Sequence, residues 1–279
     1  MHSQLQTWTT WPWTGVTNRR TATPSPKADV YRALQDFAPI SLDAMKDVAL
    51  LRRVDTKYVM SQAQLYQALA HLAQDYRVLE IKGRRQHRYQ TLYFDTPDLA
   101  LYRQHHDGWR SRYKVRARAY VDSHLAFLEV KRKTNQNVTV KSRLQTPMLA
   151  TGLAPYVDTF LCTHYPYAGE QLEQVLWNAF RRITLVSKHR VERLTLDVDV
   201  SFWWGRERVE LPGVAIAEVK QEHFSLDSAF IAQMRALGVR PMHFSKYCIG
   251  VAMLHRQAKH NRFKPQLLHV DQVTKGKVQ

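Results

Sequence analysis

The sequence has few cysteines, no long apolar run and no signal-peptide core, and each absence narrows the class of protein. Its two cysteines, Cys162 and Cys248, are too few for a disulfide framework, so we expect a cytoplasmic, reducing environment. No stretch is long and apolar enough to span a bilayer, so recruitment to a membrane would depend on a membrane-protein partner.

Common catalytic motifs are also absent. The chain contains no Walker A loop, no G-x-G-x-x-G, no H-E-x-x-H and no C-x-x-C string. His105 and His106 are adjacent in "RQHHDG", which is a poor spacing for a metal site, and we interpret both as solvent-exposed. Phosphate-binding loops, dinucleotide folds and zinc proteases are therefore excluded.

Acidic residues are scarce relative to basic ones. The 279 residues include 41 Lys and Arg against 24 Asp and Glu, a formal net charge of +17, while 44% are hydrophobic. Such a chain can bury a core, and its excess charge predicts a polyanionic partner.

Strand and helix patterns are mixed along the chain. We expect a flexible arm over 1–34 and a basic tail over 256–279. Strands are predicted at 51–60, 88–96, 109–121, 125–133, 137–145 and 213–221, with two more within 182–203. Helices are predicted at 61–76, 97–108, 170–180 and 225–238, with a final one near Ser245. Many antiparallel strands with intervening helices predict an α+β fold whose sheet is large enough to close on itself.

Several predicted strands carry cations on alternate positions. In "WRSRYKVRARAY" these are Arg110, Arg112, Lys114, Arg116 and Arg118. Similar faces carry Lys131, Lys141 and Arg143, then Lys57, and then Lys188 and Arg190. A solvated sheet face usually mixes charge signs, because like charges on neighbouring strands repel. Repetition on several strands therefore predicts a concave or closed sheet that grips several phosphates.

Carboxylates on these faces point to a metal-bound triphosphate. Glu129 and Glu218 each stand in the string E-V-K, two residues before a lysine on the same face. Carboxylates hold the Mg²⁺ or Mn²⁺ that bridges phosphate oxygens, whereas they gain nothing in a groove for nucleic acid. Each is equally compatible with a salt bridge. Asp197 and Asp199 share a predicted face, where a structural role is favoured over a second metal site.

The sequence resembles VTC-type polyphosphate polymerase domains of the triphosphate tunnel metalloenzyme superfamily over residues 35–255. The resemblance lies in "RRVDTKY", "YQTLYFDTPDLALY", "YKVRARAY", "FLEVKRK", "KSR", "AEVKQ" and "FSKYCIG", in that order. It implies an antiparallel β-barrel tunnel with flanking helices. It also implies transfer of the ATP γ-phosphate to a growing polyphosphate chain with release of ADP, using Mn²⁺ or Mg²⁺.

Site residues carry over position by position. The resemblance assigns phosphate contacts to Lys57, Arg116, Arg118, Lys131, Lys141, Arg190, Ser245 and Lys246. We expect catalytic roles for Lys57, Arg116, Arg118, Lys131 and Arg190. Substrate binding is expected from Lys141, Ser245 and Lys246, joined by Arg112, Lys114, Arg143 and Lys188. Glu218 matches the family's metal-binding glutamate, and Glu129 is expected nearby as a ligand or as an orienting group. Lys188 departs from the family, which has Tyr there.

Three other functions compete with the polymerase. Tunnel-fold hydrolases begin with E-x-E-x-K, whereas here the aligned string is Arg53-Val-Asp55-Thr-Lys57, and Arg in the first place favours a phosphate clamp. A non-catalytic polyphosphate-binding subunit would lack the metal glutamate, which is present as Glu218. An RNA-binding protein should show aromatic side chains on the basic face, but in 109–120 they fall mainly on the other face. We therefore expect ATP and inorganic polyphosphate as partners, and no nucleic acid.

Overall fold

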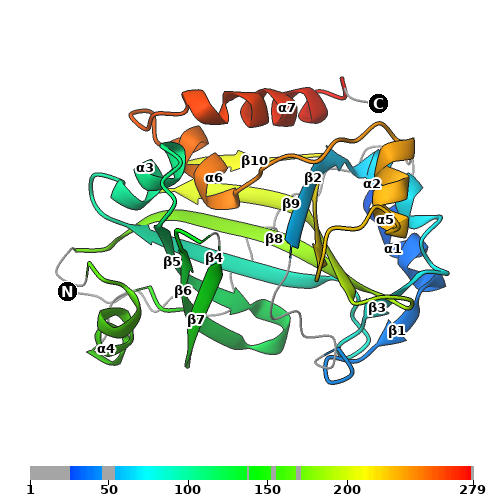
Figure 1. The fold of residues 1–279 in the computed structure, drawn as a ribbon, viewed down its shortest axis with the longest axis horizontal. Helices are drawn as coiled ribbons and strands as arrows, with labels where there is room; N and C mark the ends of the chain where they lie inside the picture. The colour runs from blue at the N-terminus through cyan, green and yellow to red at the C-terminus, as the bar shows by residue number, and fades with distance from the viewer. Residues whose placement is uncertain (1–25, 46–53, 137, 152–154, 168–170, 278–279) are drawn as a thin grey trace.

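Eleven strands form one sheet in the computed structural model, which describes residues 26–45, 54–136, 138–151, 155–167 and 171–277 (Figure 1). Eight of them follow the order β2-β11-β9-β8-β4-β5-β6-β7, with β1, β3 and β10 attached at the side. The strands are β1 Ala38–Ile40, β2 Val54–Ser61, β3 Tyr76–Leu79, β4 His87–Asp95, β5 Arg112–Tyr120, β6 Leu125–Lys133, β7 Thr139–Thr146, β8 Glu173–Ser187, β9 Glu192–Trp204, β10 Glu207–Glu210 and β11 Val214–Gln221. Every pairing is antiparallel except that of β1 with β3.

Helices flank the sheet, and side-chain caps fix where several of them begin. They are α1 Pro26–Ala33, α2 Gln62–Leu69, α3 Ala100–His106, α4 Pro155–His164, α5 Ala229–Ala236, α6 Lys246–Leu254 and α7 Lys264–Thr274. Ser61, Ser228 and Ser245 each accept a hydrogen bond from a backbone N–H in the first turn of α2, α5 and α6. The predicted helix at 225–238 and the final helix at Ser245 are confirmed.

Alternation of side chains gives the sheet two different faces. On one face, apolar residues of β2, β9 and β11 such as Tyr58, Leu196 and Ala217 pack with α1, α2 and α5. Farther along the same face, Val115 and Leu128 pack with α4. In Figure 1 these helices gather at opposite ends of the sheet. Because successive side chains point to opposite faces, the cations that alternate with these apolar residues lie on the other face of the sheet.

The other face is divided between an apolar part and a polar part. In the apolar part, α3 packs on β4 and β5, α6 packs on β8 and β9, and α7 packs on β2 and β11. The residues of this part include Tyr93, Phe180, Phe202, Tyr247 and Val270. The rest of this face carries the charged side chains of β2, β5, β6, β9 and β11. Helix α6 therefore lies against the sheet directly beside the charged region.

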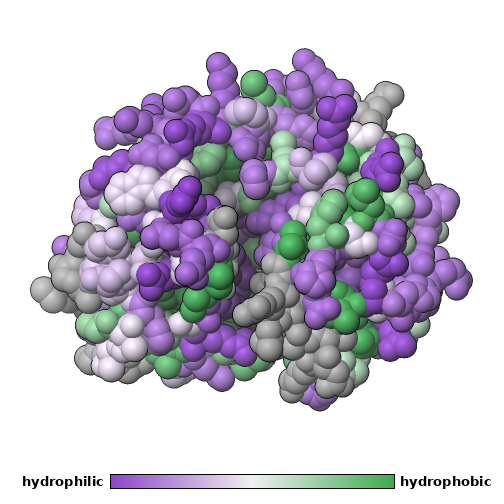
Figure 2. Space-filling view, viewed as in Figure 1, coloured by the Kyte–Doolittle hydropathy of each residue, from purple (hydrophilic) through white to green (hydrophobic). Residues whose placement is uncertain are grey.

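The sheet curls around this charged face. Strands β2 and β6 are first and seventh in the strand order, yet the ammonium groups of Lys57 and Lys131 are close enough to repel each other. The space-filling view shows a hollow near the middle of the molecule in which hydrophilic residues lie (Figure 2). The predicted α+β fold with a tunnel-like antiparallel sheet and flanking helices is confirmed. Within the described residues the sheet is curled, and its edge strands β2 and β7 are not hydrogen-bonded to each other.

A β-bulge changes the face that β9 presents. Ala179 pairs with Ser201 and Arg181 pairs with Val198, so β9 has one residue more than β8 over this stretch. Asp199 adopts a left-handed φ of 53° there. Asp197 consequently lies on the charged face, while Asp199 pairs with Arg181 (3.6 Å between Nε and Oδ2), which lies on the opposite face. The predicted shared face of Asp197 and Asp199 is therefore wrong.

The predicted helix at 170–180 is also wrong, because residues 173–180 begin β8. Leu176 and Phe180 pack on one face of the sheet, while Leu172 and Trp177 pack on the other. A strand buried on both faces lacks the alternation of a half-buried strand, and its apolar spacing then resembles that of a helix.

Both ends of the described chain contain packed structure where an arm and a tail were expected. Residues 1–25 of the expected arm lie outside the described residues, but α1 packs through Val30 and is followed by buried Leu34. In the expected tail, α7 packs through Val270 and Val273. His105 and His106, expected in solvent, bond with the carbonyl of Tyr113 and the side chain of Asn261. No described helix has the length and apolarity needed to cross a membrane.

Gly250 allows α6 to lie close to the sheet. A Cβ at this position would lie 2.6 Å from Leu176 Cδ2 and 2.7 Å from Phe202 Cδ1, and both side chains are fully buried. We expect Gly250→Ala to lower the free energy of unfolding. Overpacking costs about 1–3 kcal/mol, more than the about 1 kcal/mol that alanine gains over glycine in a helix.

Chemical denaturation measures this difference. Ala252→Ser, on the same helix at a partly exposed position, is the control and should change stability by less than about 0.5 kcal/mol. An unchanged or raised unfolding free energy for Gly250→Ala would show that the sheet yields to the extra methyl group.

Candidate active site

Cationic side chains from six strands and one helix converge on the curled face. We call them the basic cluster: Lys57 on β2, Lys114, Arg116 and Arg118 on β5, Lys131 on β6, Lys141 on β7, Arg182 on β8, Lys220 on β11, and Lys246 on α6. Carboxylates are fewer, and three of them, Glu129, Asp197 and Glu218, each contact two of these cations. The arrangement keeps an excess of positive charge on an inward surface.

Glu129 joins three neighbouring strands. It stands directly opposite Arg116, which donates to Oε2 from Nε at 2.7 Å and approaches it with Nη2 at 2.6 Å. Lys141 of β7 forms a second ion pair with Glu129. Burial alone would raise the pKa of Glu129, but Arg116, Arg118 and Lys141 hold it well below its usual range. With 1% of its side chain exposed, this carboxylate orients cations and is closed to a metal ion.

Arg118 lies deeper, and within the described part of the chain no carboxylate forms an ion pair with it. Its Nε donates to Thr91 Oγ1 at 3.2 Å, and its guanidinium lies 5.7 Å and 5.8 Å from the ring centroids of Tyr89 and Phe180. Burial lowers the pKa of its guanidinium. A buried guanidinium without an ion-pair partner of its own is the kind of group that a phosphate would stabilise.

Helix α6 supplies two site residues from its first turn. Ser245, the N-cap, accepts a hydrogen bond from Lys114 Nζ at 2.8 Å, and Lys246 forms an ion pair with Asp197. The next residue, Tyr247, donates to Asp95, whose carboxylate also accepts the backbone N–H groups of Leu101 and Tyr102. This chain of contacts fixes α6 to β4 and α3, so Ser245 and Lys246 face the sheet.

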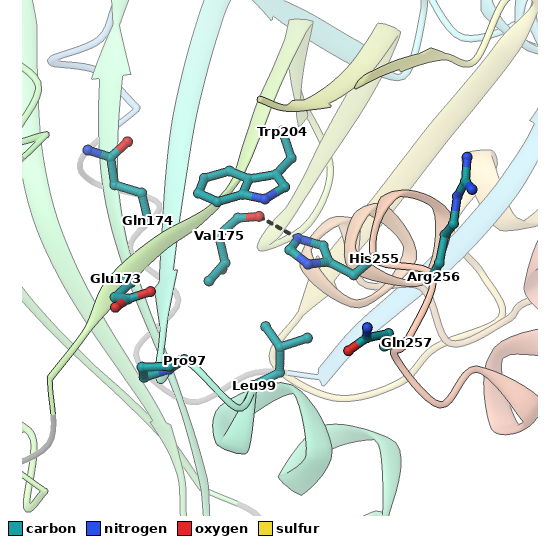
Figure 3. Close-up of a pocket in the computed structure, with 9 residues that line it drawn as sticks. All are labelled: Pro97, Leu99, Glu173, Gln174, Val175, Trp204, His255, Arg256 and Gln257. Carbon is teal, nitrogen blue, oxygen red and sulfur yellow. Dashed lines mark hydrogen bonds between the residues drawn. The ribbon is translucent and has the colours of Figure 1, made fainter. Parts of the chain in front are cut away.

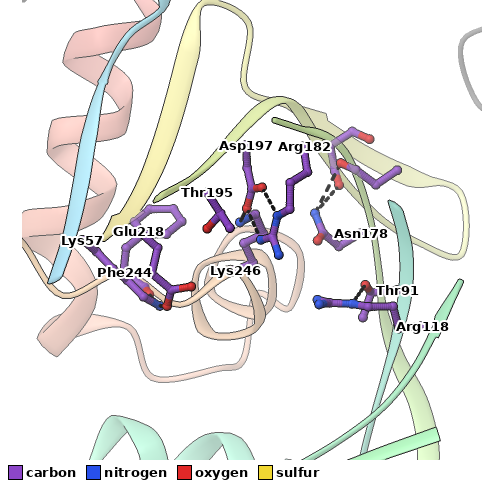
Figure 4. A network of polar contacts seen from close by, with 12 residues as sticks. Lys57, Thr91, Arg118, Asn178, Arg182, Thr195, Asp197, Glu218, Phe244 and Lys246 are labelled. Carbon is purple, nitrogen blue, oxygen red and sulfur yellow. Dashed lines mark hydrogen bonds and ion pairs between the residues drawn. The ribbon is translucent and has the colours of Figure 1, made fainter. Parts of the chain in front are cut away.

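Arg182 is the main site residue that the sequence did not reveal. It donates to Asp197 through Nε at 2.6 Å and Nη2 at 2.8 Å, beside Asn178 and Lys246 (Figure 4). Its position falls directly after the wrongly predicted helix at 170–180. The alternation of side chains could have identified it, because Arg182 lies six residues before Lys188 and therefore on the same face of the strand.

Glu218 lies between Lys57 and Lys220. Its Oε1 is 3.4 Å from Lys57 Nζ, Lys220 contacts Oε2, and 21% of its side chain is exposed. Lys57 also donates to the carbonyl of Phe244 at 2.9 Å. Burial opposes its charge, but Lys220 and Lys57 hold the pKa of Glu218 well below its usual value. It is the most exposed of the three carboxylates and is ionised.

These residues fit a metal ion that is shared with phosphate. The described residues contain no group of three His, Cys, Asp or Glu side chains that could hold a metal on its own. Mg²⁺ commonly binds through one or two carboxylates, waters and substrate phosphates, so Glu218 alone suffices for that mode. The expected ligand Glu129 fits less well than Glu218, because 1% of its side chain is exposed, compared with 21% for Glu218.

The structure brings most of the predicted site residues together, and the two exceptions are Lys188 and Arg190. Arg112 and Arg143 lie at the rim: Arg112 repels Lys114, and Arg143 lies 5.0 Å from the ring centroid of Phe127. Lys188 instead donates to the carbonyl of Ala73 at 3.0 Å, and Arg190 is exposed in the turn after β8. The strand ends at Ser187, so the alternation that suggested these two residues stops before it reaches them.

A separate surface cavity lies away from the basic cluster. Its volume is about 400 Å³, and its lining includes Leu99, Val175, Trp204 and His255 (Figure 3). His255 Nε2 is 2.8 Å from the carbonyl oxygen of Val175, and its ring stacks on Trp204. None of the cations of the basic cluster lines this cavity.

The family follows from comparison with known domains. The family model of the VTC domain matches residues 52–154 and 162–255, which is most of the chain, so the protein belongs to the VTC domain family. A comparison with curated proteins gives no match.

Solved structures give weaker likenesses. The PH1819 protein from Pyrococcus horikoshii OT3 is 12% identical, with 72% of this chain and 96% of that chain covered and a TM-score of 0.41. The putative adenylyl cyclase HpAC1 from Hippeastrum, reported with a dominant triphosphatase activity, is 14% identical, with coverage of 74% and 98% and a TM-score of 0.45. TM-scores this low carry no argument about function, which rests on the residues of this chain.

Crowding makes the lysines of the cluster sensitive to pH. Burial, with repulsion from Lys114 and Lys57, lowers the pKa of Lys131 to about 7. Burial likewise lowers the pKa of Lys114, Lys141 and Lys246, each to about 8. Affinity for inorganic triphosphate should therefore fall, by at least about tenfold, as pH rises from about 7 to 9, because the ammonium groups that attract it lose their protons.

Calorimetric titration at fixed ionic strength checks this, with Lys131→Met as a variant whose pH dependence should be shallower. In the empty protein, the unfolding free energy should rise from about pH 7 toward pH 10, because the unfolded lysines still bind protons that the folded ones have lost. Affinity that is constant or rises with pH would contradict the assignment.

Proposed function

We propose that this protein is an ATP-dependent polyphosphate polymerase that transfers the γ-phosphoryl group of ATP to the end of a polyphosphate chain and releases ADP. The observation that carries the proposal is the length of the cationic surface. On β5, cations occupy every second position from Arg112 to Arg118, with Lys131 and Lys133 opposite on β6. Six residues of strand span about 20 Å, which exceeds what three phosphoryl groups need.

The charged groups suit phosphoryl transfer without a general base. The acceptor is a terminal phosphate oxygen, which is already ionised at neutral pH, so no residue has to remove a proton. It attacks the γ-phosphorus while the bond to the β–γ bridging oxygen breaks, and ADP leaves with that oxygen. Catalysis then depends on positioning and on neutralising the charge of the transferred group. Arg116, Arg118 and Arg182 are placed to do this.

The remaining residues have supporting roles in the proposal. A divalent ion bound with Glu218 and the phosphates would neutralise charge on the β- and γ-phosphate oxygens. Lys57, Lys131 and Lys246 would contact neighbouring phosphates, and Ser245 would orient Lys114. Lys131 and Lys141 would also guide the product outward.

Two rival functions fit the contacts less well. A base-stacking nucleic-acid site needs open aromatic faces, but Tyr89, Phe127 and Phe180 are covered by guanidinium groups at 5.0–5.8 Å. A triphosphate hydrolase gains from several metal-binding carboxylates, whereas here Glu129 and Asp197 are engaged by cations.

Incubation of the purified protein with ATP and Mn²⁺ or Mg²⁺ tests the proposal. ADP release together with a polymer ladder on a polyphosphate-stained gel is the expected result. Free phosphate without polymer would identify a hydrolase instead. Triphosphate binding without turnover would identify a non-catalytic subunit.

Glu218→Gln tests the metal role. This change keeps the shape of the side chain and removes its charge, so ADP release should fall by roughly 100-fold or more. Glu222→Gln, four residues farther on and exposed, is the control and should keep full activity. Equal activity in both variants would remove Glu218 from the mechanism.

Arg118→Ala and Arg190→Ala separate two positions that the sequence treated alike. Arg118 is buried in the basic cluster, so its loss should abolish ADP release while the melting temperature holds, because repulsion within the cluster is relieved. Arg190 is exposed in a turn, and its loss should leave most of the activity. ADP release and thermal melting are measured for both variants. Full activity in Arg118→Ala together with lost activity in Arg190→Ala would support the catalytic role expected for Arg190 from the sequence.

A further inference from the structure

Asp197 connects two elements that carry catalytic cations. The carboxylate, with 3% of its side chain exposed, receives a two-point hydrogen bond from Arg182 on β8 and an ion pair from Lys246 on α6. Figure 4 shows Arg182 and Lys246 meeting at this one side chain. The sheet and the helix are thus joined within the site by a single negative charge.

The guanidinium of Arg182 is held both by aromatic rings near it and by Asp197 at its edge. Its guanidinium carbon lies 5.1 Å from the ring centroids of both Tyr89 and Phe180, and Lys246 Nζ lies 4.6 Å from the Phe180 ring. Asp197 occupies one edge of the guanidinium, through Nε and Nη2, which leaves Nη1 as the nitrogen without a bond to Asp197. The orientation of Arg182 is therefore determined before any phosphate enters.

A carboxylate at this place has a cost for binding. Substrate and product are polyanions, so Asp197 repels them and competes with them for Lys246. Groups that weaken substrate binding are retained in a catalytic site when they contribute more to the transition state than to the bound substrate. Orientation of a guanidinium and an ammonium toward the transferred phosphoryl group is such a contribution.

We propose that Asp197 is a positioning residue for phosphoryl transfer, which holds Arg182 and Lys246 in their reactive orientation at the expense of substrate affinity. The inference rests on the proposed function. It differs from a purely structural role, which would lower affinity and turnover together. It also differs from metal ligation, because both carboxylate oxygens are already bonded to cations.

Asp197→Asn in the full-length chain tests this. The variant keeps the shape and one acceptor oxygen but removes the charge. We expect kcat for ADP release to fall at least tenfold, while the Kd for inorganic triphosphate, measured by calorimetry, stays equal or decreases. Asp199→Asn is the control on the same strand, since Asp199 pairs with Arg181 away from the cluster, and it should alter neither value. Weaker binding together with slower turnover, or an unchanged kcat, would overturn the proposal.

A second variant keeps the test decisive if Asp197→Asn does not fold. Arg182→Lys retains the positive charge but cannot form the two-point bond, so it should also lose kcat with little change in Kd. Wild-type turnover in Arg182→Lys would overturn the role of the pair. If the wild-type chain releases no ADP, the proposed function fails, and the calorimetry still decides the competition: weaker triphosphate binding by Asp197→Asn would overturn it.

Discussion

Repulsion between like charges in a poorly solvated space is the constraint on which this structure depends. Cations from β2, β5, β6, β7, β8, β11 and α6 share one curled face, and burial lowers the pKa of Lys114, Lys131 and Lys246 among them. Three carboxylates offset part of that repulsion by standing between pairs of cations. The compensation is incomplete, and the remaining positive charge is what a polyphosphate would neutralise. Stability of the empty protein and affinity for the ligand are therefore opposed at the same residues.

Helix α6 links the apolar packing of the fold to the charged site. Its middle turns fill the apolar part of the curled face through Ile249 and Val251, while Ser245 and Lys246 enter the charged part. Tyr247, between them, is bonded to buried Asp95. Because one short helix does both tasks, its placement on the sheet determines where two of the groups proposed to contact phosphate lie.

Strand alternation revealed the parts of the site where one face is buried and the other is charged. On β5, Val115 and Ala117 are buried while Lys114 and Arg116 face the cluster, so the pattern in the sequence is unambiguous. On β8 both faces are buried, and its apolar residues predicted a helix over 170–180, so the strand was expected to begin only at Arg182, which was not singled out. The parity of Lys188 was read correctly, but the strand ends at Ser187 and the side chain turns toward Ala73.

Contacts between distant segments could not be predicted from local pattern. Asp197 and Lys246 are 49 residues apart, and Lys114 and Ser245 are 131 apart. Their meeting depends on how the whole sheet curls and on where α6 packs. The resemblance to VTC domains supplied Ser245 and Lys246 as candidates, but it did not indicate that carboxylates would hold their neighbours.

The bulge at Asp199 gives β9 two different roles along one strand. Before the bulge, odd-numbered residues such as Thr195 and Asp197 face the cations; after it, even-numbered Val200 and Phe202 face α6. One extra residue in β9 thus sets the boundary between the charged part and the apolar part of the curled face. If Asp199 instead continued a regular ladder without the bulge, Val200 and Phe202 would turn to the opposite face of the sheet, and Ser201 and Trp203 would lie under the helix. The site therefore depends on the position of the bulge in β9, because the bulge decides which side chains of the strand face the cations and which face α6.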